Sequence, residues 1–159
     1  MTELDAIDRK ILSLLQQDSR LTMQEISEKV GLSPSPCHRR IKMLEERGII
    51  TRYGVTIDQR AVGLPVSVFV SIKLARQQEE DLERFAKAVA AWSEVMECYL
   101  MTGEADYQLR ILVRSLTEFE DFLRYRLTRV TGVANVTTSF ALRPVIYKTS
   151  LPTLDQVSS

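Results

Sequence analysis

Residues 22–48 constrain the fold of this chain most, because they contain two short helical patterns separated by a glycine. Thr22 and Glu25 have the spacing of a capping box, in which each side chain satisfies a free N–H of the first helical turn. Gly31 stands where a helix can end in left-handed backbone. Pro34 then suits the first position of a second helix, where its missing N–H costs nothing. The pattern predicts two helices joined by a tight turn.

The second of these helices, which ends near Gly48, is apolar on one side and cationic on the other. Cys37, Ile41 and Leu44 recur at helical spacing and are expected to face inward. The chain as a whole has no net charge, yet residues 33–53 hold five cations against two acids. A helix–turn–helix whose second helix exposes positive charge is suited to enter the major groove of DNA.

Positions on this helix predict how each residue would meet DNA. Ser35, His38 and Arg39 lie near its N-terminus, where side chains reach base edges and nearby phosphates. Cations further along more often hold the phosphate backbone, and Ser33 can cap the helix and offer its amide or hydroxyl to a phosphate. The expected DNA-binding residues are Ser33, Ser35, Pro36, His38, Arg39, Arg40, Lys42 and Arg47, with Arg40, Lys42 and Arg47 assigned to the backbone.

Two plainer interpretations stay open from the residues alone. The cations are also compatible with a solvated surface helix that pairs them with its own acids, such as Arg40 with Glu45. His38, the only histidine, is either a polar contact in the groove or a passive surface residue.

An amphipathic helix precedes this motif, and a linker follows it. Asp5 suits its N-cap, and an apolar stripe runs through Gln17, so three helices are expected to share one core. Residues 49–53 are β-prone and predict a wing or a connecting strand. We therefore expect a winged-helix-like DNA-binding domain over 1–54 and a linker over 55–65.

From residue 66 the hydrophobic period changes from helical to alternating. The pattern reads as strand, helix, strand, and then strand, helix, strand again, with Thr117 and Glu120 placed as a capping box before the second helix. This order predicts a ferredoxin-like βαββαβ domain over 66–152, an antiparallel sheet with both helices on one face. The whole chain is then α+β, with a flexible tail over 153–159.

Composition excludes several other classes of protein. The acidic N-terminus lacks a signal-peptide pattern, and the longest apolar stretch is too short to span a bilayer, so we expect a cytoplasmic protein without a membrane partner. Cys37 and Cys98 have no zinc or disulfide spacing and are expected to be buried, with no metal bound. The second domain lacks histidine and any nucleophile–base pair, so no catalytic residue, required cofactor or enzymatic activity is expected.

Four motifs in order make the chain resemble one protein family. They are L-D-x-x-D-x-x-I-L at 4–12, S-P-x-P-C-x-x-R at 33–40, T-G-x-x-D-Y at 102–107 and T-S-L-P at 149–152. With this architecture, the sequence closely resembles the Lrp/AsnC ("feast/famine") family of prokaryotic transcription factors along nearly its full length. Position 35 is Ser where many relatives carry Thr, and the hydroxyl is kept.

The resemblance implies a transcriptional regulator that binds double-stranded DNA, as an activator or repressor, and responds to a metabolite. Members dimerise through the second domain, often assemble further into octamers, and many bind an amino acid between subunits. The implied effector-binding residues are Thr102, Gly103, Glu104, Asp106, Tyr107, Thr137, Thr138 and Ser139.

Two alternatives remain for this second domain. The 102–107 segment alone is also a plain hairpin turn, with Gly103 supplying a positive φ. The alternative function is an architectural protein that compacts DNA through oligomerisation without an effector.

Overall fold

The computed structural model describes residues 3–152, and the tail expected at 153–159 lies outside the described residues. The chain divides into two compact units. Residues 57–145 form one unit, and the N-terminal residues through 56 form the other together with the segment that begins at 146. We describe each unit by itself.

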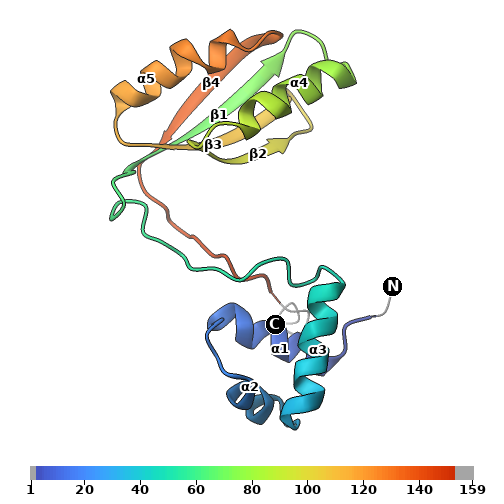
Figure 1. Cartoon of the computed structure of the whole chain (residues 1–159). Helices are drawn as coiled ribbons and strands as arrows, with labels where there is room; N and C mark the ends of the chain where they lie inside the picture. Colours follow the sequence, from blue (N-terminus) through green and yellow to red (C-terminus); the bar gives the residue numbers. More distant parts are fainter. Residues whose placement is uncertain (1–2, 153–159) are drawn as a thin grey trace. The chain divides into compact units, whose positions relative to one another are not determined.

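Three helices build the N-terminal unit: α1 (Ala6–Gln17), α2 (Met23–Val30) and α3 (Pro34–Glu46) (Figure 1). Both predicted N-caps are confirmed: Asp5 and Thr22 each accept a backbone N–H three residues on, within reciprocal capping boxes. These caps satisfy N–H groups that the first helical turn leaves without an intrahelical partner. The local sequence therefore determines where α1 and α2 begin.

The turn between α2 and α3 depends on Gly31, which has a φ of 77° and ends α2 as predicted. Ser33 is the N-cap residue of α3, but its side chain makes no capping hydrogen bond, so the capping role predicted for its hydroxyl is wrong. No strand forms at residues 49–53, where a wing or connecting strand was predicted. The core of the unit consists of Ile11, Ile26, Val30, Cys37, Ile41 and Leu44.

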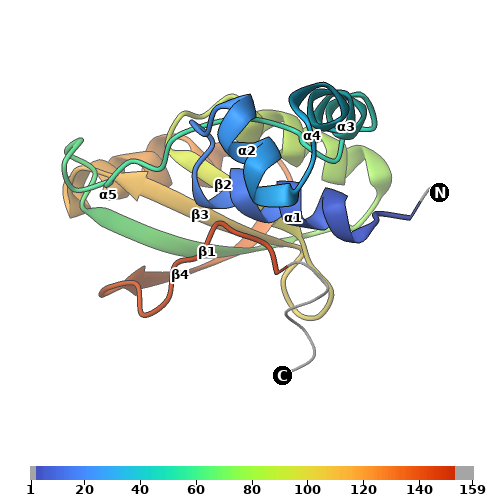
Figure 2. The ribbon, with the colours of Figure 1, turned by 90° about the horizontal axis from the view of Figure 1, so that it is seen from below.

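The second unit follows the predicted βαββαβ order. Its antiparallel sheet has the strand order β2-β3-β1-β4, and α4 and α5 cover one face (Figures 1 and 2). This arrangement is the ferredoxin-like fold that the alternating and helical periods predicted. The elements are β1 (Val66–Leu74), α4 (Glu79–Ala90), β2 (Val95–Leu100), β3 (Tyr107–Val113), α5 (Leu116–Tyr125), a 3-10 turn (Leu127–Arg129) and β4 (Val133–Ala141).

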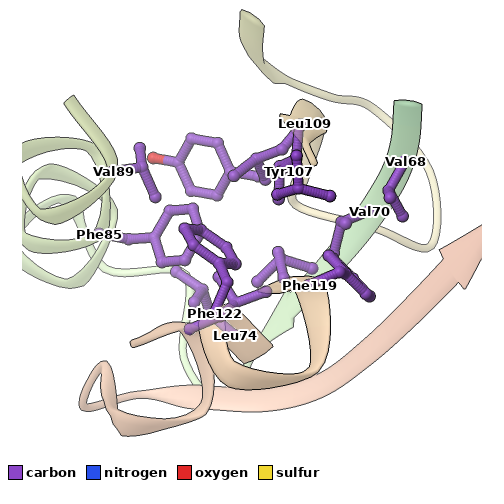
Figure 3. Close-up of a cluster of buried hydrophobic side chains, with 13 residues drawn as sticks. Val68, Val70, Leu74, Phe85, Val89, Tyr107, Leu109, Phe119 and Phe122 are labelled. Carbon is purple, nitrogen blue, oxygen red and sulfur yellow. The ribbon is translucent and has the colours of Figure 1, made fainter. Parts of the chain in front are cut away.

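The core of this unit lies between the sheet and the two helices. Alternate residues of β1 and β3 point toward the helices and are fully buried, as a period of two requires. Figure 3 shows Phe85 of α4 beside Phe122 of α5, and the two helices also contribute Val89 and Phe119 to the same buried cluster. Trp92 packs edge-to-face on Phe122, with ring centroids 5.2 Å apart.

Two details of the second unit differ from the sequence analysis. α5 begins two residues earlier than predicted, because Ser115 rather than Thr117 is its N-cap and accepts the N–H of Glu118. Cys98 is exposed at the edge strand β2, whereas Cys37 is buried as expected. Neither difference alters the topology.

Truncation of Phe85 tests this account of the core. Phe85 is 1% exposed, so Phe85→Ala should lower the free energy of unfolding of the second unit by about 3–5 kcal/mol. The measurement is urea unfolding followed by the fluorescence of Trp92, the single tryptophan. Leu116→Ala is the control, because Leu116 is 63% exposed and its loss should change the value by no more than about 0.5 kcal/mol. Equal effects of the two variants would contradict the packing described.

Candidate nucleic-acid interface and effector loop

The predicted DNA-binding residues lie on α3 or at its ends, and the helix is anchored by its opposite side. Cys37, Ile41 and Leu44 are buried against α1 and α2. A helix turns 100° per residue, so side chains on the other face are held outward on a rigid support. The exposed members of the predicted set are Ser33, Ser35, His38, Arg39, Lys42 and Arg47, while Pro36 and Arg40 are half-buried.

Two side chains on the outward face of α3 are available to a partner outside the chain. Within residues 3–152, neither His38 nor Arg39 makes a hydrogen bond or an ion pair through its side chain. Lys42 Nζ lies 3.7 Å from Glu46 Oε1, and both side chains are about two-thirds exposed. Exposed pairs of this kind contribute little stability, so a phosphate can displace Glu46 from Lys42 at small cost.

Arg40 makes contacts inside the N-terminal unit. Its Nη1 donates to Asp5 Oδ2 and to Asp8 Oδ1, each at 2.7 Å, and both acids belong to the first turn of α1. The two carboxylates raise the pKa of Arg40, Asp8 contributing most. Nη1 of Arg40 is therefore already engaged inside the protein, and the phosphate contact predicted for Arg40 would have to use its other guanidinium N–H groups.

A contact missed by the sequence analysis holds the other end of α3. Tyr53, from the segment after the helix, donates its hydroxyl to Glu45 Oε1 at 2.8 Å. Partial burial and the neighbouring Glu45 carboxylate raise the pKa of Tyr53 to about 12, so the hydroxyl keeps its proton near neutral pH. The eight-residue separation has no helical periodicity, and no local pattern indicated this pair.

The predicted effector loop is a closed turn between β2 and β3. The N–H of Met101 donates to the carbonyl of Asp106 at 2.9 Å, and Gly103 has a φ of 106°, which other residues rarely adopt. Thr102, Gly103 and Glu104 are exposed at its tip. The exposed tip carries one acidic side chain, that of Glu104.

Asp106 serves the structure of this loop. Its Oδ2 accepts the N–H of Leu74 at 2.7 Å, and Lys73 Nζ lies 3.5 Å from its Oδ1. Its own N–H donates to the carbonyl of Ile72 at 2.8 Å. The buried carboxylate therefore ties the loop to the end of β1, and its predicted contact with an effector would have to share these partners.

The remaining predicted effector residues are spread over both faces of the sheet. The Tyr107 hydroxyl donates to the carbonyl of Leu82, and its ring packs on Phe85 in the core, so its side chain is not available to a ligand at the loop tip. On β4, Thr137 and Ser139 pair with Ser71 and Phe69 of β1 on the face away from the helices, whereas Thr138 pairs with buried Val70. Because β1 separates β4 from β3, one chain does not bring Thr137 and Ser139 to the loop tip.

Residues 3–152 offer no metal centre and no membrane-spanning helix. Within that range, no three His, Cys, Asp or Glu side chains gather in a way that would hold a metal ion. The helices of the same range are too short and too polar to cross a membrane.

Two family models match the chain in consecutive stretches. Residues 4–51 match the winged helix-turn-helix DNA-binding model, which covers α1, α2 and α3. Residues 67–151 match the Lrp/AsnC ligand binding domain, which covers the sheet, α4 and α5. The matches fall on the cationic helix and on the domain that carries the 102–107 loop.

Several characterised proteins are similar over nearly their full length. The chain is 41% identical to the Bkd operon transcriptional regulator of Pseudomonas aeruginosa, covering 96% of this chain and 99% of that protein. It is 39% identical to the leucine-responsive regulatory protein of Rhizobium meliloti, covering 90% and 92%. A transcriptional regulator from Neisseria meningitidis, crystallised in complex with L-Met, superposes with a TM-score of 0.91 at 38% identity, covering 97% and 99%.

These relatives are transcriptional regulators, and this agrees with the prediction from the sequence that the chain is not an enzyme. The cationic face of α3 and the full-length matches agree on one assignment. The chain belongs to the Lrp/AsnC family of DNA-binding transcriptional regulators.

Proposed function

We propose that this regulator reads DNA through the outward face of α3 as a symmetric homo-oligomer, and that an amino-acid effector bound at the 102–104 loop tip adjusts this binding. Its place of action is then the cytoplasm, where the DNA of a prokaryotic cell lies. The observation that carries the proposal is the exposed face of α3, where Arg39 makes no ion pair within the described range while the opposite side is buried.

Each exposed side chain on α3 has a role in this proposal. Arg39 and His38 reach base edges from the N-terminal half of the helix, and Ser35 adds a hydroxyl. Lys42 and Arg47, further along, hold phosphates. Ser33 has a hydroxyl that is not used for capping, so this hydroxyl can meet a phosphate. Pro34 and Pro36 have no N–H, and Cys37 N–H donates to the carbonyl of Ser33, which leaves the N–H of Ser35 as the first-turn amide for the same phosphate.

Recognition of an operator requires two copies of this helix. One helix reads only a few base pairs, whereas a twofold pair reads two half-sites one or more helical turns apart. The sheet face opposite α4 and α5 is our candidate for the self-association surface. Phe69 is 40% exposed there, and short polar side chains such as Ser67 and Ser71 surround it on β1. A flat face of this kind can pack on a second sheet.

An amino acid is the effector class that the loop suits. A small zwitterion needs N–H donors for its carboxylate and an acceptor for its ammonium group. The amides near Gly103 supply the donors, and exposed Glu104 supplies the acceptor, since Asp106 is already engaged. The structural relative crystallised with L-Met supports this class. Thr137 and Ser139 would join the site from a neighbouring subunit.

The comparisons give no support to the alternative of an effector-independent architectural protein. The similar proteins are named as regulators of an operon, as a leucine-responsive regulator and as a regulator of glutamate uptake. An effector-binding regulator of particular genes is the better proposal.

Substitution of Arg39 tests the DNA interface. The purified protein first selects bound fragments of genomic DNA, and a recovered operator is then labelled for fluorescence anisotropy. Arg39→Ala should weaken binding by about 1–3 kcal/mol and relax specificity at one position of the operator, because a lost base contact has both effects.

The matched control for Arg39→Ala is Lys87→Ala, which removes the same formal charge from exposed α4. Its affinity for the operator should stay within about twofold of the unchanged protein. Unchanged affinity of Arg39→Ala, or an equal loss in both variants, would contradict the proposed interface.

Thermal unfolding with a panel of amino acids, L-methionine included, tests the effector site. An effector at 100 times its Kd should stabilise the protein by about 2.7 kcal/mol, which raises Tm by roughly 5–10 °C in a chain of this size. Glu104→Gln removes the charged acceptor for the ammonium group and should abolish most of that rise.

Glu83→Gln is the matched control, because Glu83 is an exposed acid whose only described contact is a 3.9 Å pair with Lys87. It should keep the full ligand-induced rise in Tm. A rise that persists undiminished in Glu104→Gln would remove the loop from the proposal, and no response to any amino acid would remove the effector.

A further inference from the structure

All four carboxylate oxygens of Asp5 and Asp8 accept hydrogen bonds, two within the helix cap and two from Arg40. Asp5 Oδ1 accepts the N–H of Asp8 at 2.8 Å, and Asp8 Oδ2 accepts the N–H of Asp5 at 3.4 Å, which closes the capping box of α1. The remaining oxygens, Asp5 Oδ2 and Asp8 Oδ1, both accept from Arg40 Nη1. One guanidinium nitrogen therefore holds both acids while both acids cap the helix.

This bridge joins α3 to the start of α1. Arg40 is three residues after Cys37 and four before Leu44, so it stands at the flank of the buried stripe rather than on the outward face. Apolar packing restricts the separation of two helices but allows small rotations and slides, because it has no preferred direction. Two short charge-assisted hydrogen bonds to fixed helix-capping groups are directional and remove that freedom.

We propose that Arg40 is a positioning residue for DNA recognition: by bridging Asp5 and Asp8 it fixes the orientation of α3, and it does not neutralise a phosphate. The inference rests on the interface proposed above and changes the role of one residue in it. The residues that touch DNA are then those on the outward face, and the acids of the first turn of α1 contribute to operator affinity through Arg40.

Neutralising Asp5 or Asp8 distinguishes a positioning role of Arg40 from a direct contact with DNA, because the two roles predict opposite changes in DNA affinity. Asp5 and Asp8 are negative, so simple electrostatics expects their neutralisation to strengthen binding to DNA, a polyanion. If they hold Arg40 and thereby α3, their neutralisation weakens binding instead. Asn is as good an N-cap as Asp, so Asp5→Asn keeps the cap of α1 and removes only the charge that faces Arg40.

The experiment measures operator affinity of the full chain against salt concentration, with the labelled duplex selected as above. The variants are Arg40→Ala, Asp5→Asn, Asp8→Asn and, as the control for a phosphate contact, Lys42→Ala. Arg40→Ala should weaken binding by roughly 2- to 30-fold, the range for residues that act without touching the ligand. Its plot of log K against log salt should keep the slope of the unchanged protein, whereas Lys42→Ala should make the slope shallower by about 0.9.

Two further readings and a control for folding complete the test. Asp5→Asn and Asp8→Asn should each weaken binding, and adding either to Arg40→Ala should cause no further loss, because the interaction is already gone. Binding is measured below each variant's Tm and scaled to the active fraction found by stoichiometric titration, so loss of folded protein does not imitate lost affinity. Asp5→Asn preserves the helix cap and carries the test even if Arg40→Ala folds poorly.

Several results would overturn the proposal. A shallower salt slope in Arg40→Ala, equal to that of Lys42→Ala, would make Arg40 a phosphate contact. Tighter binding by Asp5→Asn and Asp8→Asn would show that the acids only repel DNA. Unchanged affinity in Arg40→Ala would reduce the bridge to local stability. Failure of the unchanged protein to select any DNA would instead refute the proposed interface, a different outcome.

Discussion

The burial of one side of α3 is the constraint on which the DNA-binding unit depends. Cys37, Ile41 and Leu44 are removed from water by Ile11 of α1 and Ile26 of α2. Because a helix has fixed periodicity, this burial determines which other side chains point outward. Which side chains of α3 face outward is thus a geometric consequence of the apolar core, and the sequence places Arg39 and Lys42 among them.

Local signals were enough to predict most of the fold. Asp5, Thr22 and Gly31 act within three or four residues of themselves, and each does what its spacing predicted. The alternation in β1 likewise predicted its buried face, because period two leaves no other register. The start of α5 was misplaced because Ser115 and Thr117 both offer hydroxyls with an acid three residues on, and local sequence does not rank them.

Roles that depend on distant partners were not predictable in the same way. Arg40 lies on the correct helix, yet its acceptors are 35 and 32 residues away in sequence. Asp106 was recognised as part of the loop, but its bond to the N–H of Leu74 exists only because β3 pairs with β1. The flank position of Arg40 beside the buried stripe was a signal in the sequence, and it indicates a neighbour inside the protein rather than outside.

In both units, burial distinguishes the charged side chains that maintain the fold from those that are available for binding. Asp8 and Asp106 are buried carboxylates, and each accepts a backbone N–H and faces a cation of the protein. A buried charge without partners is costly, so these groups remain paired and fix local geometry. Arg39 and Glu104 are exposed and make no ion pair within the described residues, and their charges stay available to an external partner. Desolvation explains the difference between these two groups of charges. Charges that the fold buries need partners within the fold, whereas charges that stay exposed to water remain available to DNA or to an effector.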